Sequence, residues 1–484
     1  MRENILLLIV IWSALPLAGQ TFNNRYNFDP YNAGNGYCVE QSGDSLLIFS
    51  NYSDSLYKIG VHVLSLDGEL LSSKSIYKDS TWLFVGYSNS VDQYEEGYVS
   101  GSTKRFPEPN YRGHIIKWDL SADTLKTKVF HAAEGDSMII FQQAKAIADG
   151  FVAVGSTRDG VSGEKIILLK TDFDLNEIWR REYGSSTIPH AGYSVVQTPD
   201  GGYLLGGVRK VIDSWDHCVI KTAADGVQQD IAYFGTGYEG YITHVAVTAD
   251  GNYVFGGMKK TGQYEDQSLV CKIDANLNEI WCNTYNSPGP ECYVNAIKLL
   301  DDGNLIVCGV DRSNWDMYGY ILKIDPDGNE IWYRKYAQTE DNWCFFYDVI
   351  QTNDGGYFLT GSLFPEIDLS QDIWGLKLDD MGCLVPGCDT LVHVPERDAS
   401  WGVSIYPNPT SQFVNVYLSA SSKQQLSTVS LELVDMQGRL VRQFAPHLTD
   451  TTYMMDVEDL PAGIYVLNVF ADGAVVKSEK IMKE

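Results

Sequence analysis

Short apolar runs alternate with tight turns along most of the chain. In the segment 193–235, four such runs occupy residues 193–199, 203–208, 217–222 and 227–234. Asp-Gly and Asn-Gly dipeptides between apolar runs favour hairpins, because these residues tolerate positive φ. The pattern therefore predicts units of four short antiparallel strands.

The turn that separates the first two strands of a unit recurs at a nearly constant interval. Its glycines are Gly43, Gly97, Gly150, Gly201, Gly251, Gly303 and Gly355. Successive glycines are 50 to 54 residues apart, and a fixed period of roughly 40 to 50 residues is typical of propeller blades. We expect an all-β fold, a seven-bladed β-propeller of four-stranded blades.

Paired aromatic residues indicate how the blades pack. The pairs are Trp179 and Tyr183, Trp281 and Tyr285, and Trp332 and Tyr336. The i, i+4 spacing places both rings on one face of a strand. A single blade cannot bury that face, so we expect the neighbouring blade to cover it.

The N-terminal segment is expected to complete the ring. Phe22 and Tyr26 repeat the aromatic spacing although no complete unit precedes them, and the last unit lacks a fourth strand. We therefore predict a propeller domain over residues 20–388, with the N-terminal strand in its last blade. Such closure removes exposed sheet edges.

The strand order predicts one face of tight turns and one face of long connections. The long connections are 102–113, 208–216, 287–291, 310–317, 337–345 and 362–371. Loops on a rigid scaffold commonly carry binding residues. The candidate ligand-binding residues on this face are Trp82, Tyr111, His190, Trp215, Trp315 and Trp343. The alternative is that these side chains only cap the blades.

The charge and the motifs exclude several kinds of chemistry. The net charge of −27 disfavours nucleic acid, because a phosphate backbone would be repelled. The sequence has no His-Glu-x-x-His and no Gly-x-Ser-x-Gly. Gly235–Gly240 has the residue pattern of a dinucleotide fingerprint, but a β-run follows it in place of the helix that this motif requires. The acids on the long-connection face are Asp213, Asp216, Asp311, Asp316 and Asp341. We assign them no catalytic role and predict no metal ligand.

One segment resembles a calcium loop at its start. Asp325-Pro-Asp-Gly-Asn-Glu330 lacks the later glutamate and the flanking helices of that motif. A hairpin turn is the favoured interpretation, so no cofactor is predicted. Ca²⁺ on the acidic surface is the weaker alternative.

Nine cysteines are present, an odd number for an oxidising compartment. Cys271 and Cys282 lie symmetrically about a predicted turn, and Cys383 and Cys388 are close enough to staple the end of the repeats. Both pairs are disulfide candidates. The alternative is that several of these cysteines are buried free thiols.

The N-terminus has the pattern of a secretory signal. A short basic start precedes the apolar run 5–12, and Ala18 and Gly19 follow. We expect a signal peptide over residues 1–19. No other apolar stretch is long enough to predict a transmembrane span.

The repeat stops near residue 389, and a different pattern of apolar positions begins. We predict a linker at 389–401 and a small C-terminal β-sandwich at 402–484. This region contains Tyr406-Pro-Asn-Pro409, Gly438-Arg439 and Leu460-Pro-Ala-Gly-Ile-Tyr465 in that order, and Lys477-x-x-Lys480-Ile481 near its end. These motifs resemble the type A C-terminal sorting domain of type IX secretion cargo.

The resemblance implies export across a Gram-negative outer membrane. It also implies two partners, the type IX secretion machinery and a sortase-like peptidase that removes this domain, followed by release or attachment at the cell surface. The repeats are similar to kelch blades and to the blades of pyrroloquinoline quinone-type propellers. That second resemblance supports the fold alone, because the quinone ligands cannot be located here.

Together these features predict a secreted, surface-displayed propeller that binds an extracellular ligand, glycan or protein, through its long-connection face. One alternative is a secreted polysaccharide hydrolase or lyase that uses the same face. Another is a structural adhesin whose repeats serve only as a rigid spacer.

Overall fold

The computed structural model forms two compact units, residues 1–386 and 387–484. It describes residues 21–27, 33–53, 57–76, 82–86, 90–105, 111–131, 136–159, 163–185, 187–211, 214–235, 240, 242–262, 265–312, 317–337, 342–365, 371–384, 388, 401–406, 410–420, 429–435, 440–444, 452–471 and 474–483. The predicted signal peptide (1–19), residues 389–400 of the predicted linker, and Trp315 lie outside these ranges. Across these described ranges, no helix is long and apolar enough to cross a membrane.

The first unit contains seven antiparallel sheets, as predicted from the seven turn glycines. Blade 1 contains β2 (Ala33–Ser42), β3 (Ser45–Ser53), β4 (Tyr57–Ser65) and β5 (Leu70–Ile76). Blade 2 contains β6 (Trp82–Val85), β7 (Val91–Tyr94), β8 (Gly97–Arg105), β9 (Tyr111–Asp119) and β10 (Thr124–Phe130). Blade 3 contains β11 (Asp136–Ile147), β12 (Gly150–Asp159), β13 (Gly163–Thr171) and β14 (Glu177–Tyr183).

The remaining blades follow the same order. Blade 4 contains β15 (His190–Gln197), β16 (Tyr203–Val211), β17 (Ser214–Thr222) and β18 (Gln228–Phe234). Blade 5 contains β19 (Ile242–Val247), β20 (Tyr253–Gly262), β21 (Glu265–Ile273) and β22 (Glu279–Gly289). Blade 6 contains β23 (Cys292–Leu299), β24 (Leu305–Asp311), β25 (Tyr318–Ile324) and β26 (Glu330–Tyr336). Blade 7 contains β27 (Asn342–Gln351), β28 (Tyr357–Pro365), β29 (Asp372–Leu378) and, from the other end of the chain, β1 (Phe22–Tyr26).

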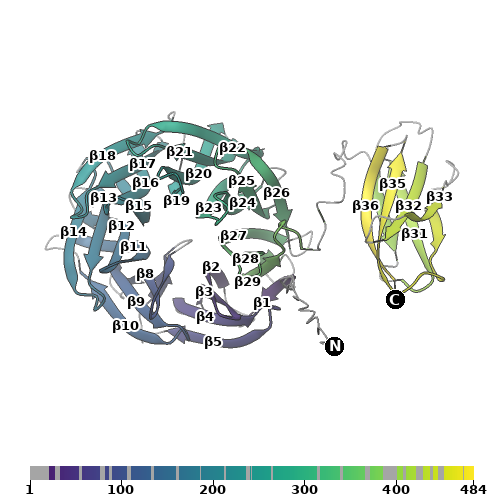
Figure 1. The fold of residues 1–484 in the computed structure, drawn as a ribbon, viewed down its shortest axis with the longest axis horizontal. Coiled ribbons are helices and arrows are strands. Elements are labelled where there is room, and N and C mark those ends of the chain that lie inside the picture. Colours follow the sequence, from purple (N-terminus) through teal and green to yellow (C-terminus); the bar gives the residue numbers. More distant parts are fainter. Residues whose placement is uncertain are drawn as a thin grey trace, which may run out of the picture. The chain divides into compact units, whose positions relative to one another are not determined.

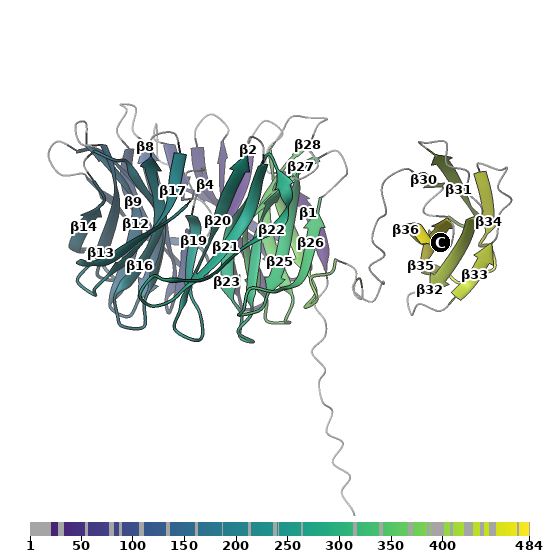
Figure 2. The ribbon, with the colours of Figure 1, turned by 90° about the horizontal axis from the view of Figure 1, so that it is seen from above.

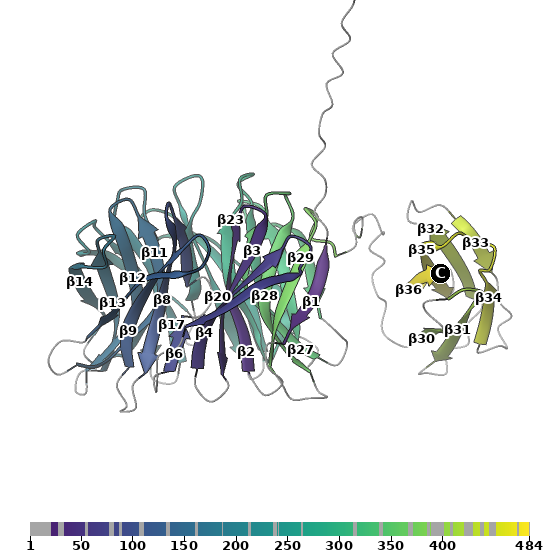
Figure 3. The ribbon, with the colours of Figure 1, turned by 90° about the horizontal axis from the view of Figure 1, so that it is seen from below.

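The seven sheets are arranged around a central axis (Figure 1). The first strand of each blade lies nearest the axis and the last strand lies at the outside. Figures 2 and 3 show this unit from the side, where many of its strands run roughly along the axis. Blade 2 differs from the others because two short strands, β6 and β7, both pair with β8 in place of one inner strand.

An ion pair explains the repeated Asp-Gly turn and the repeated lysine of the third strand. In blade 4, Lys221 Nζ lies 3.4 Å from Asp200 Oδ2, and Gly201 has a φ of +83°. The corresponding pairs are Lys170–Asp149 at 2.8 Å, Lys272–Asp250 at 2.7 Å, Lys323–Asp302 at 3.0 Å and Lys377–Asp354 at 2.9 Å. Each pair ties the third strand to the turn between the first and second strands.

The paired aromatic residues dock on a glycine of the next blade. Tyr183 Oη donates to Gly226 O at 2.7 Å, and a Cβ at Gly226 would lie 2.7 Å from the ring of Trp179. The same contact recurs for Tyr285 with Gly328 at 2.8 Å and for Tyr336 with Gly382 at 2.5 Å. These glycines need both the positive φ and the missing side chain.

Strand β1 supplies the same contact of paired aromatic residues with a glycine between blade 7 and blade 1. It pairs antiparallel with β29 from Phe22 opposite Lys377 to Tyr26 opposite Ile373. Tyr26 Oη donates to Gly68 O at 2.7 Å, and a Cβ at Gly68 would lie 2.8 Å from the ring of Phe22. The first and last repeats are therefore joined as the other blades are.

Hydrogen bonds near the bulge of the inner strands also join neighbouring blades. They are Ser90 N to Cys38 Sγ (3.0 Å), Ala146 N to Asp92 Oδ2 (2.9 Å), Val195 N to Gln143 Oε1 (2.6 Å), Val245 N to Ser194 Oγ (3.1 Å), Thr243 Oγ1 to Val294 O (2.6 Å), Asn295 Nδ2 to Phe346 O (2.6 Å) and Val39 N to Asp348 Oδ2 (3.2 Å). The last of these connects blade 1 with blade 7.

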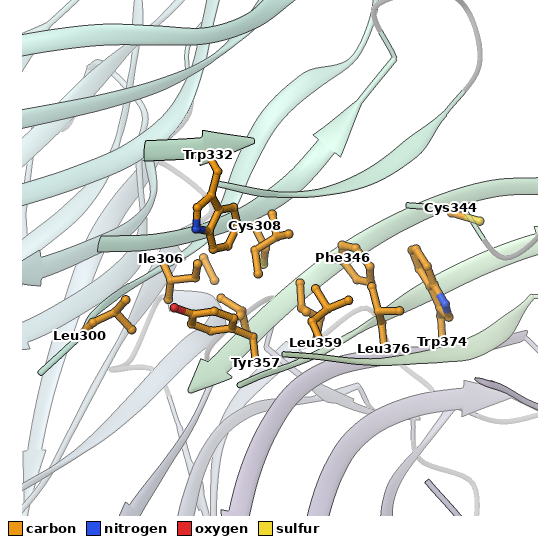
Figure 4. Packing of buried hydrophobic residues seen from close by; sticks show 14 of the residues in the cluster. Leu300, Ile306, Cys308, Trp332, Cys344, Phe346, Tyr357, Leu359, Trp374 and Leu376 are labelled. Carbon is orange, nitrogen blue, oxygen red and sulfur yellow. The ribbon is translucent and has the colours of Figure 1, made fainter. Parts of the chain in front are cut away.

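Apolar side chains fill the spaces between blades. Between blades 6 and 7, Trp332 packs against Tyr357 with ring centroids 5.8 Å apart, and Phe346 stacks on Trp374 at 4.0 Å (Figure 4). The other side chains of this cluster are aliphatic residues or cysteines. Burial of such faces is the main source of stability for stacked repeats.

The structure joins Cys271 on β21 and Cys282 on β22 by a disulfide. Cys383 and Cys388 are also disulfide-bonded. The other five cysteines are buried and are not disulfide-bonded, namely Cys38, Cys218, Cys292, Cys308 and Cys344.

The second unit contains two antiparallel sheets around one apolar core, which is the predicted small β-sandwich. One sheet contains β30 (Trp401–Tyr406), β31 (Phe413–Ala420) and β34 (Thr452–Asp456). The other contains β33 (Leu440–Phe444), β32 (Val429–Asp435), β35 (Gly463–Ala471) and β36 (Ala474–Lys483).

Candidate functional site

The described candidate residues lie at one end of the ring. Trp343, His190 and Trp82 lie at or next to the start of an inner strand, and Tyr111 and Trp215 lie at or next to the start of a third strand. These positions belong to the face predicted to carry the long connections. Two of those connections are shorter than predicted, because β16 and β17 pair as far as Val211 opposite Ser214 and β22 continues to Gly289. Trp343 is 47% exposed, Tyr111 and Trp215 are half-buried, and His190 is only 2% exposed. His190 is therefore less accessible than its place next to a connection suggests, and the side chain of Trp82 lies outside the description.

Trp343 is part of an exposed group between blades 6 and 7. The guanidinium of Arg312 lies 4.9 Å from the Trp343 ring centroid. Arg312 Nη1 is also 3.2 Å from Glu291 Oε2, and its backbone N–H donates to Glu291 O at 3.2 Å. An aromatic face thus lies beside a paired cation and anion at the open end of the blades.

A second group lies in blade 4 and includes His190. Arg209 lies 3.6 Å from the ring centroid of Tyr233 and 2.5 Å from Asp216 Oδ2. The Tyr233 hydroxyl lies 3.5 Å from His190 Nε2, and His190 Nδ1 lies 2.8 Å from Ile188 O. Burial and the Arg209 charge lower the pKa of His190 despite the bond to Ile188, so the ring is neutral at pH 7.

Trp215 lies outside this group, with Lys210 Nζ 5.9 Å from its ring centroid.

Aromatic residues continue from Trp343 along the inner strand of blade 7. Phe345 and Tyr347 are partly exposed, whereas Cys344 before Phe345 and Phe346 after it are buried. The rings of Phe345 and Tyr347 are 5.2 Å apart, and Tyr347 lies 4.5 Å from Tyr37 on the inner strand of blade 1. β27 and β2 are the inner strands of blades 7 and 1 (Figure 1), and we call the rings of Phe345, Tyr347 and Tyr37 on these strands the aromatic wall.

Charged residues lie on the inner strands of several blades. Lys145 Nζ is 2.9 Å from Asp92 Oδ1, and Lys298 Nζ is 3.6 Å from Asp348 Oδ1. Burial opposes the charge of Lys298, but Asp348 and then Glu40 outweigh burial and raise the pKa of Lys298. Burial raises the pKa of Glu40 to about 7, Lys298 opposes that rise, and Asp92 and Asp348 add to it.

Glu40 gives a pH-dependent stability. Because the folded-state pKa is raised from 4.5 to about 7, folding favours protonated Glu40, and stability falls as pH rises between these values. We expect Glu40→Gln to match the stability of the wild type at pH 4.5 and to be more stable at pH 8 by about 1–2 kcal/mol. This difference is smaller than the free energy that the whole pKa shift would give, because Glu40 is partly exposed and solvent screens its charge.

Urea unfolding at several pH values measures this difference. The matched control is Glu95→Gln, which makes the same substitution at an exposed turn residue. A Glu40→Gln curve parallel to that of the wild type from pH 4.5 to 8 would contradict the assignment.

No group of three or more His, Cys, Asp or Glu residues within the described ranges could hold a metal ion. In the segment that resembles a calcium loop, Asp325 Oδ1 accepts from Asp327 N at 2.9 Å and from Asn329 N at 2.8 Å, and Gly328 has a φ of +83°. This segment is the hairpin turn between β25 and β26.

The residues that the sequence did not single out are Arg312, Glu291, Phe345, Tyr347, Tyr37, Glu40 and Lys298. The one sequence signal for the aromatic residues is that Trp343, Phe345 and Tyr347 alternate with buried positions. This alternation becomes informative once β27 is known to be an inner strand. Nothing in the sequence relates Glu40 to Lys298.

Comparison with known families identifies the C-terminal unit. Residues 404–484 match the model of the secretion system C-terminal sorting domain. This is the sorting domain of type IX secretion, and it marks the protein for export to the cell surface or the medium and for interaction with the secretion machinery. A search of curated proteins gives no match.

Solved structures resemble this chain only distantly. A protein of unknown function from Dyadobacter fermentans has 9% identity and a TM-score of 0.42, over 74% of this chain and 97% of that chain. A puromycin hydrolase has 12% identity and a TM-score of 0.44, over 83% of this chain and 61% of that chain. Sqt1 from Chaetomium thermophilum has 10% identity and a TM-score of 0.41, over 82% of this chain and 98% of that chain. Likenesses this weak carry no information on activity.

Proposed function

We propose that this exported protein is a surface-displayed propeller that binds an extracellular glycan at the long-connection end of its ring. The group formed by Trp343, Arg312 and Glu291 supports this proposal most directly. A sugar ring offers an apolar C–H face and a rim of hydroxyls. An exposed indole can stack against the C–H face, while a guanidinium and a carboxylate can form hydrogen bonds with the hydroxyls.

The aromatic wall extends this surface. Phe345, Tyr347 and Tyr37 continue from Trp343 into the channel, and apolar and aromatic walls with a few polar groups are typical of ligand sites. The surface thus offers successive stacking positions to a chain of sugars. A protein ligand remains the alternative partner, and a binding screen that includes both oligosaccharides and proteins distinguishes the two.

Three of the described acids at this end are held in ion pairs. Asp216 pairs with Arg209, Asp372 with Arg25 at 2.5 Å, and Asp311 with Lys335 at 2.9 Å. Asp311 also accepts from the Tyr333 hydroxyl at 2.5 Å. Among the described residues, this pairing favours binding over acid–base catalysis.

A screen of extracellular oligosaccharides and candidate proteins, followed by calorimetry, tests the proposal. We expect Trp343→Ala to weaken glycan binding tenfold or more, since truncation of a central aromatic contact commonly costs ~2 kcal/mol or more. Trp343→Phe should retain part of the affinity, because a smaller ring remains.

The control is Ile178→Ala, which removes an exposed side chain on the outer strand β14 and should leave binding unchanged. Equal glycan binding by the wild type and by Trp343→Ala would contradict the proposed site. Binding of a protein and of no glycan would contradict the proposed ligand class.

A further inference from the structure

A cavity of about 390 Å³ lies among the inner strands of blades 3 to 6. It is lined by Lys145 on β11, the end of β15 with Thr198 and Pro199, the end of β19, and residues 297–299 of β23. The turn between β15 and β16 belongs to the tight-turn face, so this cavity lies toward the end of the channel away from Trp343. Sites for small molecules commonly have volumes of ~300–1,000 Å³.

The charged residues that line this cavity are cationic. Lys145 and Lys298 come from strands separated by β15 and β19, and His244 lies on β19 between them. None of the described lining residues is Asp or Glu. The pKa of His244 lies well below its usual range, first because the ring is buried and then because of Lys298 and Lys145. The positive field of both lysines therefore reaches the cavity wall.

The rest of the wall is mainly aliphatic. Val196, Ala246 and Val247 face the cavity from two neighbouring strands, and Ile297 follows on β23. In blades 1, 2, 3 and 6 the position of Val196 and Ala246 holds a charged residue (Glu40, Asp92, Lys145 and Lys298), and in blade 7 it holds Ile350. The apolar patch is thus local to blades 4 and 5, with one lysine on each flank.

Both lysines can turn to a ligand without leaving their acids unsatisfied. Asp92 also accepts from Ala146 N at 2.9 Å. Asp348 also accepts from Val39 N at 3.2 Å and from Val349 N at 2.9 Å. Since backbone donors stay with both carboxylates, a rotation of either ammonium group leaves no buried acid without a hydrogen bond.

We propose that this cavity binds a small organic anion, with its carboxylate between Lys145 and Lys298 and its apolar body against Val196 and Ala246. The site is separate from the glycan surface at the other end of the channel. It goes beyond the proposed glycan binding and does not depend on it.

Calorimetry with benzoate and its neutral analogue benzamide, on the full chain at low salt, tests this site. We expect saturable benzoate binding and at least tenfold weaker benzamide binding, because the amide carries no charge. Lys145→Met and Lys298→Met should each weaken benzoate binding at least tenfold. Lys165→Met, which removes the pair of Lys165 with Glu182 at 3.0 Å, is the control and should bind as the wild type does.

A further variant keeps the test decisive if either lysine variant fails to fold. Ala246→Phe places a ring in the cavity and leaves every charge in place, so it should abolish benzoate binding with an unchanged near-ultraviolet circular dichroism spectrum. The proposal is overturned by absence of benzoate binding to the wild type, by equal affinity for benzoate and benzamide, or by full binding to folded Ala246→Phe.

Discussion

A chain that begins at residue 31 should melt about 10 °C or more below one that begins at residue 20. The deletion removes β1, which pairs with β29 over five residues and buries Phe22 and Tyr26. It also removes the Tyr26 bond to Gly68 and the bond from Trp374 Nε1 to Asn23 Oδ1 at 2.6 Å. Loss of each large buried ring costs ~3–5 kcal/mol, and β29 becomes an exposed edge.

Differential scanning calorimetry measures this effect. The matched control is the double variant Phe22→Leu/Tyr26→Phe, which keeps the strand and most of its apolar surface and should lower the melting temperature by only a few degrees. An unchanged melting curve for the deletion would show that β1 does not hold the first and last blades together.

Trp374→Ala should destabilise the propeller by about 3–5 kcal/mol, the usual cost of a large-to-small change in a core. Trp374 is fully buried and stacks on Phe346 with centroids 4.0 Å apart (Figure 4). The substitution opens a cavity between blades 6 and 7 and leaves Asn23 without its indole donor.

Urea unfolding measures the difference. Trp374→Phe should have an intermediate stability, because part of the cavity is refilled. Trp343→Ala is the control, since its side chain is about half exposed and its removal should cost less than about 1 kcal/mol. Equal losses for Trp374→Ala and Trp343→Ala would contradict the assignment of one ring to the core and the other to the surface.

The number and internal order of the blades could be predicted from local signals. Each turn glycine sits between two apolar runs, so seven glycines predicted seven units, and seven sheets are present. The Trp179 and Tyr183 spacing predicted a buried face. It could not predict that the face packs on Gly226, because that contact depends on how a neighbouring blade is rotated.

The candidate site could be predicted only in part. Trp343 was found because it lies next to a long connection, but Arg312 and Tyr347 were not. Trp343, Phe345 and Tyr347 alternate with buried residues along β27, but this alternation points to Tyr347 only once β27 is known to be an inner strand.

The charged residues of the channel have a different origin. Glu40 and Lys298 belong to blades 1 and 6, and closure of the ring is what brings their charges into interaction. No pattern in either segment relates two residues so far apart along the chain. The sorting domain was recognised from ordered motifs, since its strand pattern alone predicts only a small sandwich.

The decisive experiment is a crystal structure of the exported chain with an oligosaccharide from the screen. We expect a sugar ring stacked on Trp343, within hydrogen-bonding distance of Arg312 or Glu291, on a seven-bladed ring whose last sheet contains β1. A sugar bound elsewhere on the protein, with the Trp343 face vacant, would contradict this expectation.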